Sequence, residues 1–107
     1  MKKIILSIFL TILSLNTFAQ ADSEKRANAL TEKMTKALSL TKQDQSKVYE
    51  IQLKRFQQVA IIRNKYQNDP EIKKAELKKV YNKLYGKLKG NLGEKKMLLW
   101  QKYKRNN

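Results

Sequence analysis

The stretch LTKQDQSKVYEIQLKRFQQVAIIRNKYQNDP, residues 40–70, carries the clearest helical pattern of this 107-residue chain. Its apolar residues recur at steps of three and four, the spacing of one face of an α-helix. One stripe, interrupted by Arg55, consists of Val48, Ile51, Val59, Ile62 and Tyr66, and an adjacent stripe consists of Tyr49, Leu53, Phe56 and Ala60. The two stripes together are wider than one neighbouring helix needs. We therefore expect a central helix that packs against two neighbours, or one that leaves apolar surface exposed for a partner.

The ends of this helix have their own signals. Thr41 is expected to be the N-cap, with a hydroxyl that accepts the backbone N–H of Asp44, and Asp44 is expected to answer as a short version of the capping-box acid. Leu40 is placed as the N-terminal apolar partner of a hydrophobic staple. Asp69 and Pro70 mark the next helix, because Asp caps and proline is pre-organised for the first helical position.

The rest of the chain also favours helix, because Gly, Pro and β-branched residues are scarce while Lys, Leu, Gln, Glu and Ala dominate. We expect four helices, at about residues 23–38, 42–67, 70–89 and 94–105. The cluster Gly90-Asn91-Leu92-Gly93 should close the third helix and turn the chain. The pattern thus predicts one all-α domain in which the helices form an elongated helical-hairpin arrangement.

Residues 1–21 have the three parts of a cleavable secretory signal peptide. Lys2 and Lys3 give a positive start, an apolar run follows over residues 4–15, and Ala19-Gln20-Ala21 fits a small-residue cleavage site. The apolar run is well short of the ~20 residues that span a bilayer. We expect a periplasmic or secreted protein whose mature chain, residues 22–107, has no transmembrane segment.

The charge balance points to acidic partners. Without Lys2 and Lys3, the chain keeps 22 basic residues against 9 acidic ones, a net charge of +13. Acidic polypeptides, anionic lipid headgroups, polyanionic envelope sugars and nucleic acid all fit such a charge. Nucleic acid is the least expected of the four, because the protein is expected to be exported.

The third helix carries a row of lysines. Lys79, Lys83 and Lys87 follow one another at a spacing of four, on a different face from the apolar residues Leu77, Val80, Leu84 and Leu88. Such a row is typical of a solvated face. The acidic residues of this helix stand only in its first half, so most of its lysines are free to meet an external anion.

Catalytic parts are scarce in this sequence. The chain has no histidine and no cysteine, and most of its carboxylates precede a lysine by three or four residues, as Glu50 precedes Lys54. This spacing is ordinary pairing on a helix surface. There is also no glycine-rich phosphate loop. We expect no enzyme activity, no metal site and no cofactor.

The segment Leu38–Val48 resembles the LTxxQ motif of the Spy/CpxP family of periplasmic stress proteins. Leu40 and Thr41 match the motif, Asp44 stands where the family usually has Gln, and Val48 matches the apolar position that follows. Family members carry a second, degenerate copy near the C-terminus. In this chain that copy runs over residues 92–100 and has lost both Thr and Gln, with Leu92 aligned with Leu40 and Trp100 with Val48.

The resemblance implies an all-α cradle, made by a dimer of bent helical hairpins. It also implies binding of unfolded or partly folded clients on a concave, basic and apolar surface without ATP. Our leading hypothesis is therefore an ATP-independent, chaperone-like protein of the cell envelope. Two alternatives stay open: an envelope stress-signalling adaptor or inhibitor that binds one folded partner, and a polyanion or membrane-surface binding protein in which the lysines carry the affinity.

Arg55, Phe56 and Arg63 are the candidate client-binding residues. Arg55 interrupts the main apolar stripe, Phe56 heads the neighbouring one, and Arg63 lies two turns beyond Arg55. A cation beside an exposed aromatic ring suits a mixed basic and apolar binding surface. In the opposing interpretation Phe56 belongs to the core and Arg55 only extends past it to water. A homodimer is also expected, because a lone hairpin would leave one stripe of the second helix exposed.

Overall fold

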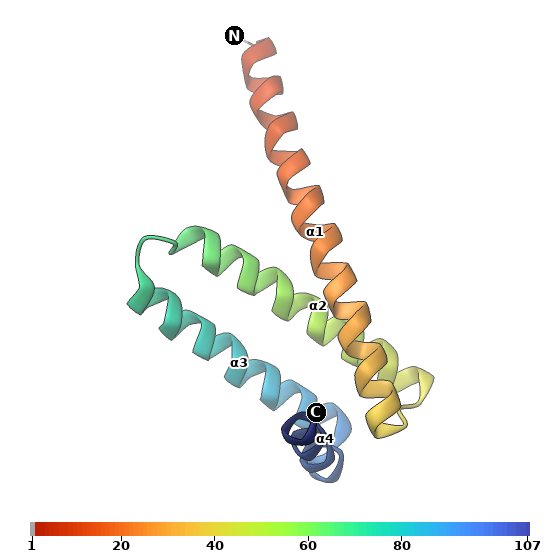
Figure 1. Ribbon diagram of the computed structural model, residues 1–107. Helices are drawn as coiled ribbons and strands as arrows, with labels where there is room; N and C mark the ends of the chain where they lie inside the picture. The colour runs from red at the N-terminus through yellow and green to blue at the C-terminus, as the bar shows by residue number, and fades with distance from the viewer. Residues whose placement is uncertain (1) are drawn as a thin grey trace.

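The computed structural model describes the helical backbone of residues 2–107 and the side chains of residues 20–107. This part of the chain folds into the four helices α1 (Lys2–Leu38), α2 (Lys42–Lys65), α3 (Pro70–Leu92) and α4 (Glu94–Asn106), and it contains no strand (Figure 1). The predicted all-α fold with four helices is thus confirmed. None of the described helical segments is long and apolar enough to cross a membrane. Residues 1–19 of the expected signal peptide lie outside the described side chains, and the signal peptide stays a prediction.

The helices are arranged around α2. α2 and α3 form an antiparallel hairpin, the C-terminal part of α1 packs along the first half of α2, and α4 closes against α1 and α3 (Figure 1). α2 therefore has two helical neighbours, as the first of the two interpretations of its wide apolar surface predicted. The C-terminal half of α2 extends with the start of α3 away from α4 (Figure 1).

The hydrophobic core lies at the end of the molecule where all four helices meet. Its buried residues are Met34, Leu38, Leu40, Val48, Leu84, Leu88, Met97 and Trp100. Burying a side chain of this size contributes about 1.5–3 kcal/mol. The far end of the α2–α3 hairpin adds no residue to this cluster. It is therefore free to shape a surface.

The predicted caps are present, but the capping box and the staple are not. Thr41 Oγ1 accepts the N–H of Asp44 at 3.1 Å, and Asp69 Oδ1 accepts the N–H of Ile72 at 3.3 Å. The Asp44 carboxylate is one methylene shorter than Glu, and instead of reaching back to Thr41 it accepts a hydrogen bond from Lys96 Nζ of α4 at 3.4 Å. The staple fails because its partner position holds Gln45, whose Nε2 donates to the carbonyl of Leu40 at 3.1 Å.

Three helix boundaries differ from the expectation by two residues or more. α1 passes through residue 23 without a break, since no Gly or Pro interrupts it there, and α2 ends at Lys65, where the N–H of Tyr66 closes on the carbonyl of Ile62. α3 continues through Gly90 to Leu92 instead of stopping at residue 89. Within the cluster of residues 90–93 only Gly93 has a positive φ, at 87°, so this glycine alone makes the turn that the whole cluster was expected to make.

Candidate functional site

An open groove of about 590 Å³ lies between α1, α2 and the first half of α3. The candidate client-binding residues Arg55, Phe56 and Arg63 all line it, brought together by the periodicity of α2. We call this surface the inner groove, and its lining residues are Arg26, Arg55, Phe56, Val59, Arg63, Lys74, Leu77, Lys78, Val80 and Tyr81. Five of these ten residues are cations and none is acidic.

The positive charge of the inner groove is largely unneutralised. Arg26 forms an ion pair with Asp22, with Nε 3.0 Å from Oδ2, on the exposed surface of α1. Among the described residues, no carboxylate lies within 4.0 Å of the cationic nitrogens of the other four cations, Arg55, Arg63, Lys74 and Lys78. A concave surface with charge of one sign and low-dielectric walls concentrates its potential. The inner groove is therefore suited to attract acidic chain segments.

The burial of Phe56 is intermediate between the exposed binding residue and the core residue that the sequence left as alternatives. Its side chain is half-buried and does not belong to the core cluster. The Arg55 guanidinium lies over its ring, 4.5 Å from the ring centroid, which is the geometry of a cation–π contact. Partial burial lowers the pKa of Arg55, and the neighbouring Tyr81 opposes that shift. Arginine stays charged at neutral pH despite such a shift, so the groove presents a permanent cation against an aromatic face.

Gln52 holds Arg55 in this position. The sequence analysis did not include Gln52 among the candidate residues. The Gln52 side chain is fully buried. Its Oε1 accepts a hydrogen bond from Arg55 Nη1 at 3.4 Å, and its Nε2 donates to Met34 Sδ at 3.5 Å. Gln52 follows Val48 by four residues and precedes Arg55 by three, a spacing that puts it on the buried stripe of the helix. A polar residue on an apolar stripe was the signal that could have identified it.

A second hollow continues the inner groove toward α4. Arg55 and Tyr81 line both, and Tyr85 and Trp100 add aromatic surface to the second one. Lys104 Nζ lies 5.8 Å from the Trp100 ring centroid, a second pairing of a cation with an aromatic ring. The mixed basic and aromatic surface thus runs from the far end of the hairpin to α4.

The residues of the two motif copies lie at the end of the molecule where the four helices meet, and of those named for the motifs only Trp100 also lines the second hollow. Leu40 and Trp100 are buried in the core, and Leu92 packs against it. When Leu92 is aligned with Leu40, Lys96 corresponds to Asp44 in the other copy of the motif. In the structure these two residues form an ion pair, with Lys96 Nζ 3.4 Å from Asp44 Oδ2. The structure therefore brings Leu40, Thr41, Asp44, Leu92 and Trp100 to one end of the fold, outside the inner groove.

Comparisons with known protein families, with characterised proteins and with solved structures find no match to this chain. In the part of the chain that the structure describes, no three acidic, histidine or cysteine side chains come together as metal ligands would. The inner groove itself offers cations and half-buried apolar side chains, which suit non-covalent contacts with a chain segment.

Proposed function

We propose that this protein is an ATP-independent, chaperone-like binding protein of the cell envelope and that unfolded or partly folded clients bind in its inner groove. One observation carries the proposal: the groove combines five cations with Phe56, Leu77 and Tyr81, and none of its lining residues is acidic. Unfolded chains present the complementary features, exposed apolar side chains and carboxylates.

The mechanism needs two steps and no nucleotide. Long-range attraction between the cationic groove and acidic client segments speeds the encounter, as it does for other oppositely charged partners. Apolar client side chains then cover Phe56, Leu77 and Tyr81, which adds affinity in proportion to the apolar area removed from water. The groove is open rather than enclosed, so bound chains can leave without a conformational gate.

The location and assembly are part of the same proposal. The signal-peptide pattern of residues 1–21 supports an envelope location. Leu98 and Leu99 of α4 support a homodimer, since their side chains are 62% and 48% exposed. A dimer joined through α4 would extend the basic and aromatic surface of each chain into a longer cradle.

The test is suppression of aggregation of a chemically unfolded client by the purified protein. Phe56→Ala should weaken suppression several-fold, because Phe56 lies in the groove. It should cost clearly less stability than the ~3–5 kcal/mol of a core Phe, because the side chain is only half-buried. Circular dichroism melts measure the second quantity.

Tyr49→Ala is the matched control, since Tyr49 is a half-buried aromatic residue of the same helix outside the inner groove. It should keep full suppression. Equal loss in both variants, or cooperative unfolding of Phe56→Ala alone, would contradict the groove assignment. Activity that disappears at high salt would favour the alternative of a polyanion-binding protein, because screening removes charge attraction but not apolar burial.

A further inference from the structure

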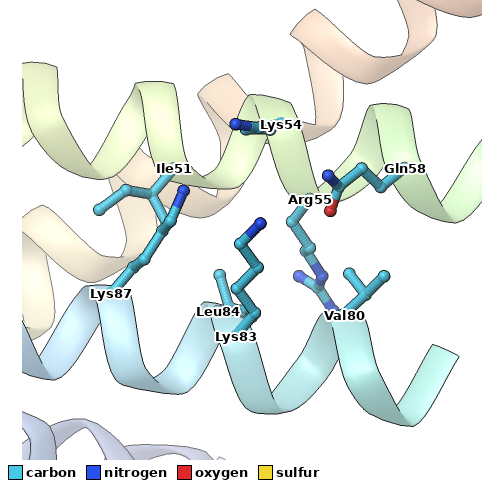
Figure 2. Close-up of a pocket in the computed structure, with 8 residues that line it drawn as sticks. All are labelled: Ile51, Lys54, Arg55, Gln58, Val80, Lys83, Leu84 and Lys87. Atoms are coloured by element: carbon cyan, nitrogen blue, oxygen red, sulfur yellow. The ribbon is translucent and has the colours of Figure 1, made fainter. Parts of the chain in front are cut away.

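The α2–α3 hairpin has a second face, which we call the outer face, turned away from α1 and the inner groove. Lys54 of α2 and Lys83 and Lys87 of α3 line a shallow depression there, and Figure 2 shows the two α3 lysines reaching toward α2, where Lys54 lies. The depression shares only Arg55 and Val80 with the inner groove. Both of these residues lie between the two faces.

Carboxylates do not neutralise this cluster. Among the described residues, no Asp or Glu oxygen lies within 4.0 Å of Lys54, Lys83 or Lys87, so the Glu50–Lys54 pair that the sequence spacing suggested does not form. Glu76 lies near the same face, where it lines the hollow next to the depression, but it pairs with Lys79 at 3.1 Å. The three ammonium groups therefore lack an internal counter-ion.

The three ammonium groups also repel one another. The pKa of Lys87 is lowered, first by the charge of Lys54, then by desolvation and by Lys83. Apart from the lysines, the depression is lined by the apolar side chains of Ile51, Val80 and Leu84 and by Arg55 and Gln58, so the Gln58 amide is the one lining side chain with an acceptor oxygen. The fold thus holds three like charges around a largely apolar lining, where a bound anion would relieve the repulsion.

We propose that Lys54, Lys83 and Lys87 form a binding site for a phosphate-class oxyanion, either a soluble pyrophosphate or the phosphate of a lipid headgroup. A phosphate group offers several anionic oxygens in tetrahedral directions and can accept from three separate ammonium groups at once. A carboxylate offers only two oxygens in one plane. This site is independent of the proposed client groove, because it lies on the other face of the hairpin.

Titration calorimetry with pyrophosphate at low ionic strength tests the site on protein purified after expression of the full chain. We expect one pyrophosphate per chain. The triple variant Lys54→Gln, Lys83→Gln, Lys87→Gln should bind at least about tenfold more weakly. The matched control, Lys33→Gln, Lys95→Gln, Lys102→Gln, removes the same charge from exposed positions of α1 and α4 and should lose less than about threefold.

A second readout is specific to the cluster. In the unmodified protein, NMR of the lysine ammonium groups should show the pKa of Lys87 rising when pyrophosphate is added, because the anion offsets the charge of Lys54. Circular dichroism should show that both triple variants keep their helices, since none of the six lysines is buried.

Vesicles distinguish the two sources of phosphate. Binding to phosphatidic acid vesicles but not to pyrophosphate, lost in the cluster variant and kept in the control, would support the lipid headgroup, and the reverse would support the soluble anion. Equal losses in the cluster variant and the control would show that only net charge matters and would overturn the site. So would the absence of binding to either probe.

Discussion

At the scale of single residues, Gln52 connects the core to the groove. Its amide lies among core residues while its carbonyl oxygen holds the Arg55 guanidinium, at 3.4 Å. The bond from Arg55 is long and the Met34 thioether is a weak acceptor, so the stabilisation that the two hydrogen bonds provide is small beside the cost of burying an amide. Its main effect is on the placement of Arg55. Gln52 is therefore a positioning residue.

Gln52→Leu should accordingly separate stability from binding. Leu has a similar volume and needs no hydrogen bond, so the free energy of unfolding should change by no more than about 1.5 kcal/mol. Arg55 loses its anchor and aggregation suppression should fall. Denaturant melts and the client assay measure the two quantities, and Gln57→Leu, on the same helix outside the inner groove, is the control. Unchanged suppression in a folded Gln52→Leu variant would mean that Arg55 needs no positioning.

Thr41 belongs to the stability of the fold rather than to binding. Its hydroxyl accepts the N–H of Asp44 at 3.1 Å, at the closed end of the molecule. Thr41→Ala should cost about 0.5–2 kcal/mol of unfolding free energy, whereas Thr41→Ser keeps the hydroxyl and should cost little. Suppression should be unchanged in both variants at temperatures where they are folded. A Thr41→Ala variant with a normal melting temperature but no client binding would contradict this structural role.

The sequence predicted which residues of a single helix share a surface, but not which residues of two different helices come together. Arg55, Phe56 and Arg63 could be grouped because helical periodicity alone puts them on neighbouring lines of α2. Lys74, Lys78 and Tyr81 complete the groove from α3, and their register against α2 depends on tertiary packing that no local pattern encodes. The Asp44–Lys96 ion pair joins residues 52 positions apart, which the capping rule for Asp44 could not anticipate.

At the scale of elements, the junction between α3 and α4 depends on one glycine. Gly93 has a φ of 87°, while Gly90, three residues earlier, lies inside α3 with open space where a Cβ would be. Sequence alone could not tell the two apart, because both stand in the same glycine cluster. The same limit applies to the end of α1, where Ser39 takes a φ of 53° although no glycine marks the position.

The two glycines should therefore respond to alanine with opposite signs. Gly93→Ala forces a Cβ into the left-handed region and should cost about 1 kcal/mol of unfolding free energy or more. Gly90→Ala should add about 0.5–1 kcal/mol, because alanine favours a helix interior over glycine. Urea melts of the two variants, each the control for the other, measure the difference. Destabilisation by Gly90→Ala would mean that α3 ends before residue 90, as the sequence first suggested.

At the scale of the whole molecule, charge and apolar surface oppose each other. A net charge of +13 on residues 22–107 keeps copies of the chain apart and attracts acidic clients. The reason that the sequence offered for a dimer was an uncovered stripe on the second helix, but α1 covers part of the surface of α2 in this structure. Among the described side chains, four large aliphatic ones are exposed, Ile61 and Ile72 at the far end of the hairpin and Leu98 and Leu99 of α4, and only the two leucines are adjacent in the sequence. We therefore expect that two copies of the chain associate through α4.

Salt should act on self-association and on client encounter with opposite signs. Added salt screens the repulsion between two copies, so the dimer should strengthen, whereas the attraction that speeds client encounter should weaken. Sedimentation velocity over a range of salt and protein concentrations measures the first effect, and the rate of client capture measures the second.

Leu98→Ser with Leu99→Ser should give a monomer at every salt concentration. The control Ile61→Ser with Ile72→Ser removes two exposed isoleucines, 64% and 44% accessible, from the far end of the hairpin and should leave the dimer intact. A wild-type chain that stays monomeric at high micromolar concentration and high salt would rule out the dimer. The inner groove of each single chain would then have to bind clients alone.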